Sequence, residues 1–322
     1  MKRHHWILHI SVVVLLYLAV SALIRGGMIN PYWEQIIQYS LVVCISSLGL
    51  NMIYGYTGQF SLGHAAFFGI GAYASALITK ATETESLTIF IVALLGGAIL
   101  SGVVALLIGL PILRLRSDYL GIATLGFGIM VKVAFDNLDR IIPMMGGSRG
   151  MSGIPKLTDF TITYVFACLS VLVLRNFVYS GHGRACISVR EDEIAAGAMG
   201  VNTTKYKTIA FVIGCFYAGL AGGLYAHLYI FLHPSNFDFL KSFDPLLIVV
   251  LGGLGSISGT ILAALGWTFF LEGLRVILPL QILDWRMVIY PILLIVVMLL
   301  RPQGLFGGRE FRFIQPQRIG GE

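Results

Sequence analysis

Long apolar runs separated by short polar segments dominate the sequence, and each run approaches the length of a membrane-spanning helix. About 20 mostly apolar residues suffice for a helix to cross the hydrocarbon core of a bilayer. No alternating strand pattern of the kind that a transmembrane barrel requires is found. The sequence therefore predicts an all-α polytopic membrane protein with about 8–10 transmembrane helices. The expected spans lie near residues 6–24, 35–53, 62–79, 88–110, 119–135, 161–178, 208–231, 244–257, 259–278 and 287–301.

Glycine-rich breaks interrupt two of these apolar stretches. The first break, residues 55–73, reads GYTGQFSLGHAAFFGIGAY, and the second, residues 252–259, reads GGLGSISG. Each stretch could form two short spans or one long broken helix, so the count varies from eight to ten. Paired interruptions in the two halves of a chain are typical of transporters that build their path from discontinuous helices. An inverted repeat would explain the pair, and so would a shared glycine-rich composition.

Polar side chains in the two breaks are candidates for a translocation path. Irregular backbone and polar groups persist at membrane depth only where protein buries them or a wet cavity meets them. Close packing of helices explains most of the glycines but not the polar residues between them. The path candidates are Thr57, Gln59, Ser61, His64, Ser256 and Ser258. For His64, a buried hydrogen bond between helices is favoured over a proton relay.

Composition supports the membrane assignment and argues against enzymatic chemistry. Of 322 residues, 57% are hydrophobic and 12% charged, with a mean hydropathy of +0.85, whereas soluble domains carry about 25% charged residues. The four cysteines have no CxxC spacing, so neither a metal site nor a redox framework is predicted. The motifs GxxxxGK[ST], HExxH and GxSxG do not occur, and we expect no catalytic activity.

Basic residues indicate orientation. The net charge of +6 reflects topology in a membrane protein, and we expect no nucleic-acid partner. With ten spans, both termini share one side with the loops near 111–118 and 179–207, and this side collects 13 Lys and Arg residues against seven opposite. The positive-inside rule places this side in the cytoplasm. The first span is expected to remain as an anchor instead of being cleaved as a signal peptide.

One long polar loop, residues 180–207, lies on the predicted cytoplasmic side. Four consecutive charged residues stand there, the last of which opens the helix-compatible stretch EIAAGAM, and the segment has the shape of a short amphipathic helix that docks into a groove of a soluble partner. A solvated connector without a docking role is the alternative. The candidate docking residues are Arg190, Glu191, Asp192, Glu193, Ala196 and Gly200.

Other charged residues have a structural interpretation. Lys132 with Asp136 and Glu272 with Arg275 have the spacing of helical ion pairs. Asp244 is followed by a proline at the start of a span, where both residue types suit a helix N-terminus.

Four segments, in matching order, resemble the LivM-type permease subunits of the branched-chain amino acid ABC importer family. They are LGLNMIYGYTGQFSLGHAAFFGIGAYASALI (48–78), SVREDEIAAGAMGVNTTKYKTIAFVI (188–213), LLIVVLGGLGSISGTILAALG (246–266) and RPQGLFG (301–307). The resemblance runs from about residue 39 to residue 307. Such a set is far more specific than any single glycine pattern.

The resemblance implies a non-catalytic permease subunit of an ATP-driven importer for Leu, Ile and Val. The implied partners are a LivH-like second permease, two cytoplasmic ATPases of the LivG and LivF kind, and a periplasmic or lipid-anchored solute-binding protein. The chain itself is expected to bind no cofactor and no metal, because ATP would be used by the ATPases. The loop at 190–200 is expected to couple to an ATPase, and the first break to line or support the path.

On this interpretation the chain divides into an N-terminal anchor helix and outer loop (1–34), a permease domain (35–307) and a cytoplasmic tail (308–322), in the bacterial cytoplasmic (inner) membrane. A urea or short-chain amide importer of the same superfamily is the principal alternative, and sugar carriers also belong to that superfamily. An ion-coupled secondary transporter would need carboxylates at mid-membrane, and the sequence offers only Glu272, near a span end.

Overall fold

Helices joined by loops make up the described part of the protein. The computed structural model describes residues 2–82, 86–113, 115, 117–277, 292, 295–296, 299–301, 303–307 and 310–311, so most of the predicted span at 287–301 lies outside the described residues. The α-helices are α1 (Lys2–Arg25), α2 (Pro31–Leu50), α3 (His64–Thr82), α4 (Leu87–Ile112), α5 (Ser117–Asn137), α6 (Phe160–Val178), α7 (Gly181–Glu191), α8 (Glu193–Ala198), α9 (Thr203–Tyr229), α10 (Phe243–Gly252) and α11 (Ile257–Ile277).

Six elements are long and apolar enough to cross a membrane. They are Pro31–Gly55, Leu87–Ile112, Tyr119–Arg140, Phe160–Val178, Thr203–Tyr229 and Ile257–Val276. Within the described ranges there is no β-sheet, and an isolated bridge between Met151 and Leu232 is the whole of the β-type pairing. The prediction of an all-α polytopic membrane protein is therefore confirmed.

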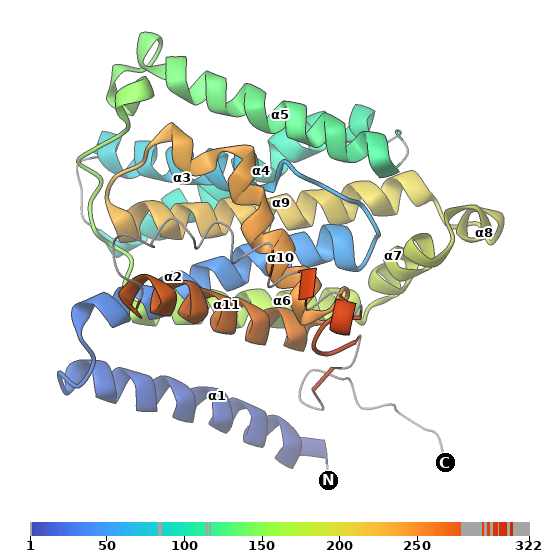
Figure 1. Ribbon diagram of the computed structural model, residues 1–322, viewed down its shortest axis with the longest axis horizontal. Coiled ribbons are helices and arrows are strands. Elements are labelled where there is room, and N and C mark those ends of the chain that lie inside the picture. Colours follow the sequence, from blue (N-terminus) through green and yellow to red (C-terminus); the bar gives the residue numbers. More distant parts are fainter. Residues whose placement is uncertain are drawn as a thin grey trace.

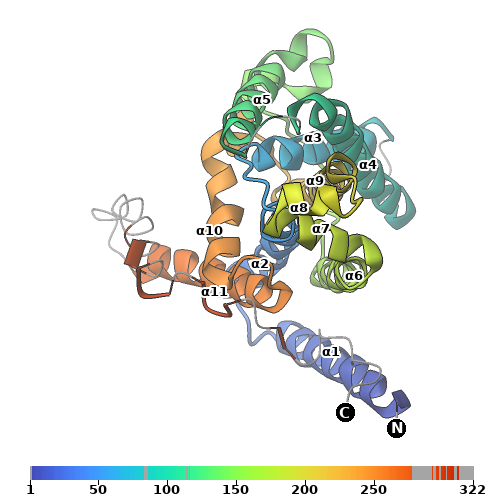
Figure 2. The same cartoon turned by 90° about the vertical axis from the view of Figure 1, so that its right-hand side faces the viewer.

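Helix α9 forms the centre of the bundle and packs most extensively against α3, α4 and α2. In the end-on view, α4 and α11 lie on opposite sides of this centre (Figure 2). Glycines bring the backbones together: a Cβ at Gly71 would lie 2.1 Å from the carbonyl oxygen of Gly219, and one at Gly214 would lie 2.5 Å from that of Gly49. Small residues at such contacts are the usual means of close helix packing in membranes.

Helix α1 lies at the periphery, where its described side chains contact α6 (Figures 1 and 2). The hydroxyls of Tyr17 and Thr161 are 3.0 Å apart, and the Tyr164 hydroxyl donates to the carbonyl of Val13 at 2.8 Å. These contacts attach the described part of the helix to α6.

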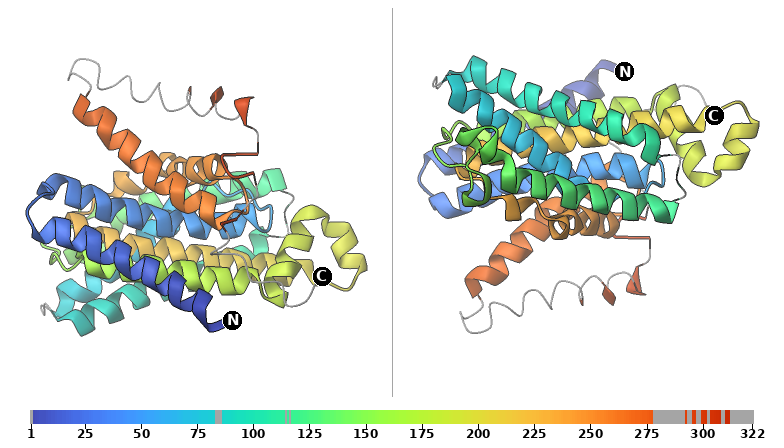
Figure 3. Two further views of the ribbon diagram at one scale, coloured as in Figure 1. Left: turned by 90° about the horizontal axis from the view of Figure 1, so that it is seen from below. Right: turned by 90° about the horizontal axis from the view of Figure 1, so that it is seen from above.

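Two elements depart from the direction of the bundle. Helix α10 has ten residues and runs across the long helices instead of along them (Figure 1). At a rise of about 1.5 Å per residue it is too short to cross the bilayer alone. The second apolar stretch is therefore a short helix followed by a long one. Helices α7 and α8 project beyond one end of the bundle (Figures 1 and 3).

Candidate translocation and coupling site

The first break begins where α2 ends. The helix continues as one π-helical turn, Asn51–Gly55, and the chain then runs irregularly to residue 63 before α3 starts at His64. The turn leaves no room for a side chain at Gly55, because a Cβ there would lie 2.5 Å from the backbone nitrogen of Gly255. The hydroxyl of Thr57 donates to the carbonyl of Ile53 at 2.6 Å. The break is thus an ordered, irregular segment buried between helices.

The second break separates α10 from α11 and is made by glycines in conformations that other residues avoid. Gly253 has φ +107° and Gly255 has φ +77°. A Cβ at Gly252 would lie 2.5 Å from the carbonyl oxygen of Gly259, so the two helices meet backbone to backbone.

Asn51 joins the two breaks. Its Oδ1 accepts a hydrogen bond from the backbone N–H of Gly255 at 2.9 Å. Its Nδ2 donates to the carbonyl of Ser256 and to Oγ1 of Thr260, both at 3.0 Å. Asn51 is fully buried, and sequence analysis missed it although it is the one amide in the apolar run LGLNMIYG. The two breaks, some 200 residues apart in sequence, therefore form a single polar junction.

The predicted coupling loop reaches this junction through Arg190. The loop folds as α7, a turn at Asp192, and the short helix α8. Nη1 of Arg190 donates to the carbonyl of Gly55 at 2.7 Å, and its Nε donates to Glu191 at 3.0 Å. Arg190 therefore connects the projecting helices to the first break.

The remaining loop candidates shape α8. The Asp192 carboxylate caps its N-terminus by accepting from the N–H groups of Ile194 and Ala195, at 2.8 and 2.9 Å. Glu193 pairs with Lys207 at 2.5 Å, Ala196 is buried, and Gly200 has φ +85° just after the helix. Two apolar side chains that the sequence analysis did not single out, Ile194 and Met199, are 86% and 84% exposed on this projection.

The described C-terminal segment closes the junction from the other side. The N–H groups of Leu305 and Phe306 donate to the carbonyls of Leu251 and Gly252 at the end of α10, at 2.8 and 3.2 Å. The Glu310 carboxylate accepts from the N–H groups of Ile257 and Ser258 at the start of α11, at 2.6 and 2.9 Å, and also from the Ser258 hydroxyl. It thus satisfies N–H groups that a helix N-terminus leaves free. Glu310 makes these contacts from within the predicted tail.

The serines of the second break lie in this junction. The hydroxyl of Ser256 accepts from the N–H of Gly259 at 3.0 Å, and Ser258 is held by Glu310. The described contacts of both side chains are therefore contacts that hold the break together. Their assignment to a path remains a prediction.

The path candidates of the first break are buried and only partly hydrogen-bonded. Gln59, Ser61 and His64 are 3%, 1% and 1% exposed. Among the described residues, both polar atoms of the Gln59 side chain, the Ser61 hydroxyl and Nδ1 of His64 have no partner. An unsatisfied buried polar group costs about 1–3 kcal/mol, and such groups in a native protein require an explanation. Other unpartnered buried polar atoms of the described residues lie on α2 and α3, so the assignment of these residues to a path remains a prediction.

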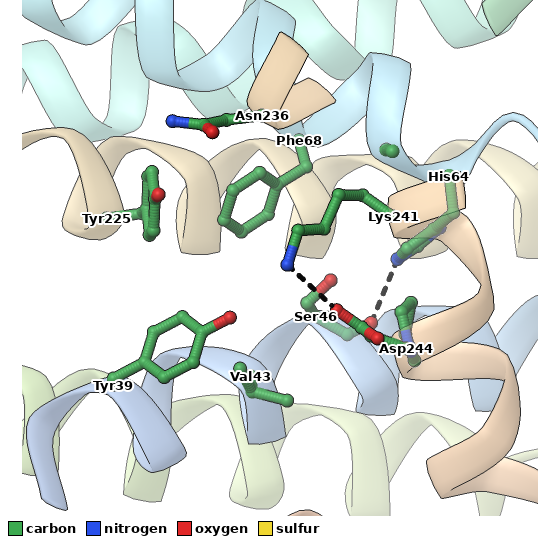
Figure 4. A pocket seen from close by; sticks show the side chains of 11 residues that line it. Tyr39, Val43, Ser46, His64, Phe68, Tyr225, Asn236, Lys241 and Asp244 are labelled. Carbon is green, nitrogen blue, oxygen red and sulfur yellow. Dashed lines mark hydrogen bonds and ion pairs between the residues drawn. The ribbon is translucent and has the colours of Figure 1, made fainter. Parts of the chain in front are cut away.

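A small cavity lies beside the N-termini of α3 and α10 (Figure 4). The two N-termini meet where the N–H of Ala65 donates to the hydroxyl of Ser242 at 3.0 Å. Nε2 of His64 lies 2.9 Å from the carbonyl of Ser46, as the interpretation of a buried inter-helix hydrogen bond predicted. The cavity is lined by Tyr39, Val43 and Ser46 of α2, His64, Ala65 and Phe68 of α3, Tyr225 of α9, and Asn236, Lys241, Asp244 and Pro245. Of the six path candidates, only His64 lines it.

The fold and the site define a class: a polytopic helical membrane protein whose two broken helices converge on one interior junction, as in the membrane subunit of a transporter. A family model described as "Branched-chain amino acid transport system / permease component" matches residues 32–298. The chain belongs to this branched-chain amino acid transport permease family, as the resemblance of its motifs predicted.

Individual relatives agree with the family match. The high-affinity branched-chain amino acid transport system permease protein LivM of Salmonella typhimurium is 33% identical, over 90% of this chain and 74% of the relative. LivM of Escherichia coli K12 is 32% identical, over 91% and 73%. The permease protein LivH of Salmonella typhimurium is 27% identical, over 82% of this chain and 91% of the relative. No solved structure matches the chain significantly.

Proposed function

We propose that the chain forms, together with a LivH-like second permease, the path by which leucine, isoleucine and valine enter a bacterial cell across the cytoplasmic membrane. The chain is the permease component of a branched-chain amino acid ABC transport system, a non-catalytic membrane subunit that binds no cofactor itself. ATP is used by ATPase partners. Both termini and the α7–α8 projection would face the cytoplasm, in line with the distribution of basic residues.

The hydrogen bond from Arg190 to the carbonyl of Gly55 carries this proposal. Two cytoplasmic ATPases, LivG-like and LivF-like, would contact α7 and α8 and move them when they close on ATP. Through Arg190 the movement reaches the first break, and through Asn51 it reaches the second. Rigid elements that rock about broken segments are an established form of alternating access.

Two further observations support the partners. The chain is similar to both LivM and LivH, which fits a path built from two related permeases. The exposed Ile194 on α8 and Met199 just after it give the projection an apolar surface beside the charged Glu191 and Glu193, suited to a groove on a soluble subunit. A solute-binding protein, periplasmic or lipid-anchored, would deliver the amino acid to the opposite side.

Uptake of labelled leucine, with labelled urea in parallel, tests the proposed function in cells that lack this chain and in cells in which it is restored. Loss and recovery of leucine uptake alone is the expected result. Recovery of urea uptake alone would contradict the amino acid assignment while leaving the ATP-driven architecture in place. If restoring the chain recovers neither leucine nor urea uptake, both substrate assignments are contradicted. Copurification with an ATPase would then show whether the ABC complex exists.

A further inference from the structure

The cavity beside α3 and α10 reaches the central part of one predicted membrane span. Its α2 residues, Tyr39, Val43 and Ser46, occupy the central part of the Pro31–Gly55 span. Substrate sites of transporters with discontinuous helices typically lie at this depth, beside the N-termini of half-helices. Two such N-termini, those of α3 and α10, adjoin the cavity.

An ion pair stands at the rim of the cavity. Nζ of Lys241 lies 3.2 Å from Oδ2 of Asp244 (Figure 4), and the two side chains are 51% and 35% exposed. Charged side chains are costly at this depth and are found facing a pathway or a protein interior. The pair therefore faces a polar space or a partner subunit instead of lipid.

We propose that this cavity binds the zwitterionic head of an α-amino acid, with Lys241 facing the substrate carboxylate and Asp244 facing its ammonium. The proposal rests on the proposed function, because it names the part of an amino acid that this chain would recognise. The ammonium nitrogen and the carboxylate carbon of a free amino acid are about 2.5 Å apart by standard bond lengths. That separation is close to the 3.2 Å of the Lys241–Asp244 pair, so head and pair can lie antiparallel and form two opposite-charge contacts.

The cavity is small, with a volume of about 60 Å³. A single water occupies about 10–15 Å³, so the cavity has room for a group of a few heavy atoms. An amino acid head has five heavy atoms, namely one nitrogen, two carbons and two oxygens. The substrate side chain would then extend out of the cavity, past the lining rings of Tyr39, Phe68 and Tyr225, which offer it apolar and aromatic surface (Figure 4).

Recognition of the head alone also explains how one site can serve several solutes. Leucine, isoleucine and valine share the head and differ only in the part that would lie outside the cavity. Urea and short-chain amides carry no zwitterion and cannot make both charged contacts. The cavity thus discriminates between the leading substrate class and its principal alternative.

Leucine transport by the complete importer, reconstituted in proteoliposomes with its ATPases and leucine-loaded solute-binding protein, tests the proposal. The variants are Lys241→Met, Asp244→Asn and the exchanged pair Lys241→Asp with Asp244→Lys. The double variant Lys132→Met with Asp238→Asn removes another lysine–aspartate pair, 2.9 Å apart, neither member of which lines the cavity, and serves as the control. ATPase stimulation by the loaded binding protein is measured on the same vesicles.

We expect each neutralised variant to lose at least tenfold in leucine transport while keeping ATPase stimulation within twofold of wild type, as the control keeps both. The exchanged pair can restore an ion pair but reverses the charges that meet the substrate, so it should assemble and still fail to transport. Transport within twofold of wild type in the neutralised variants, or full transport by the exchanged pair, would overturn the proposal. If the neutralised variants do not assemble, leucine transport by the exchanged pair alone tests the proposal. A wild-type complex that does not transport leucine would instead contradict the proposed function.

Discussion

Asn51 is the residue on which the contact between the two breaks depends. Its amide makes two hydrogen bonds to the second break and a third to Thr260, the residue after it, from a fully buried position. No backbone hydrogen bond joins the segments directly at this point in the described structure. The Asn51 side chain therefore supplies the hydrogen bonds between the two segments that backbone groups would supply in a regular element.

Replacing Asn51 with Leu should destabilise the protein markedly. The substitution leaves the N–H of Gly255 without its acceptor, at about 1–3 kcal/mol for an unsatisfied buried group, whereas the carbonyl of Ser256 keeps its hydrogen bonds from the N–H and the hydroxyl of Thr260. Thermal unfolding of the purified protein in detergent measures the effect. Asn137→Leu, at an exposed amide that donates only to Val133, is the control, and equal melting temperatures of the two variants would refute the role of Asn51.

Local sequence pattern could predict single residues only where their partners are close in the chain. The pairing of Glu272 with Arg275 was predicted from spacing and is confirmed at 3.6 Å. The pairing of Lys132 with Asp136 was wrong, because the lysine pairs with Asp238, 106 residues away. Helical spacing cannot reveal that a distant loop brings a competing carboxylate to the same position. Asp244 lies in the first turn of α10, as its interpretation as a helix-start residue implied, but its pairing with Lys241, three residues before it, was missed.

At the scale of elements, the projection of α7 and α8 is joined to the bundle by a specific contact. Because the Arg190 guanidinium donates to a carbonyl oxygen, a carboxylate in its place would repel that oxygen. The charge of Arg190 should therefore matter more for transmitting movement from α7 and α8 to the first break than for insertion of the protein into the membrane.

Arg190→Glu is expected to lower leucine transport and ATPase coupling at least tenfold while the protein still inserts. Arg184→Glu reverses the charge at an exposed position of the same helix and should have little effect. Uptake, coupled ATPase activity and membrane yield are measured for both variants. Normal transport by Arg190→Glu would count against the coupling role. Glu193→Lys, which breaks the pair with Lys207, is predicted to impair coupling in the same way.

The packing of α3 against α9 depends on the absence of a side chain at Gly71. A Cβ there would lie 2.1 Å from a carbonyl oxygen of α9, so Gly71→Ala must push the helices apart. Gly126→Ala in α5 adds a methyl group with no atom within 4 Å and should be neutral or stabilising by up to about 1 kcal/mol. Lower thermal stability of Gly71→Ala but not of Gly126→Ala is the expected pattern. Similar thermal stability of the two variants would show that α3 and α9 can move apart at Gly71 at little cost, and would contradict the prediction.

Elements were predicted well where long apolar runs mark them. The helices, both breaks and the short helix after Asp192 follow from the sequence. The transverse course of α10 does not, because an apolar run has the same composition whether it crosses the bilayer or lies across a bundle. Its ten residues are set by Gly252 and Gly253, whose close contacts and positive φ become visible only with the neighbours in place.

At the scale of the whole molecule, distant parts of the chain converge on one junction. The π-helical turn after α2, the end of α7, the gap between α10 and α11 and the described C-terminal segment all contribute atoms to it. The family match ends at residue 298, before the segment that carries Glu310.

Removing the Glu310 carboxylate should weaken this convergence. Glu310→Ala deprives the N-terminus of α11 of its acceptor and should cost about 0.5–2 kcal/mol, the usual range for a lost helix cap. Glu310→Gln keeps one acceptor oxygen and should lose less. Thermal unfolding ranks wild type, Gln and Ala in that order, and an Ala variant as stable as wild type would show that the C-terminal segment contributes nothing to the junction.

The shared junction limits how the subunit can move. Asn51 joins one break to the other and Arg190 joins the first break to the projecting helices, so a shift of one break alone would break these hydrogen bonds. We therefore expect the two breaks to move together. A state in which one break has moved and the other has not would lose the Asn51 hydrogen bonds, so such half-moved states should be rare during the ATPase cycle.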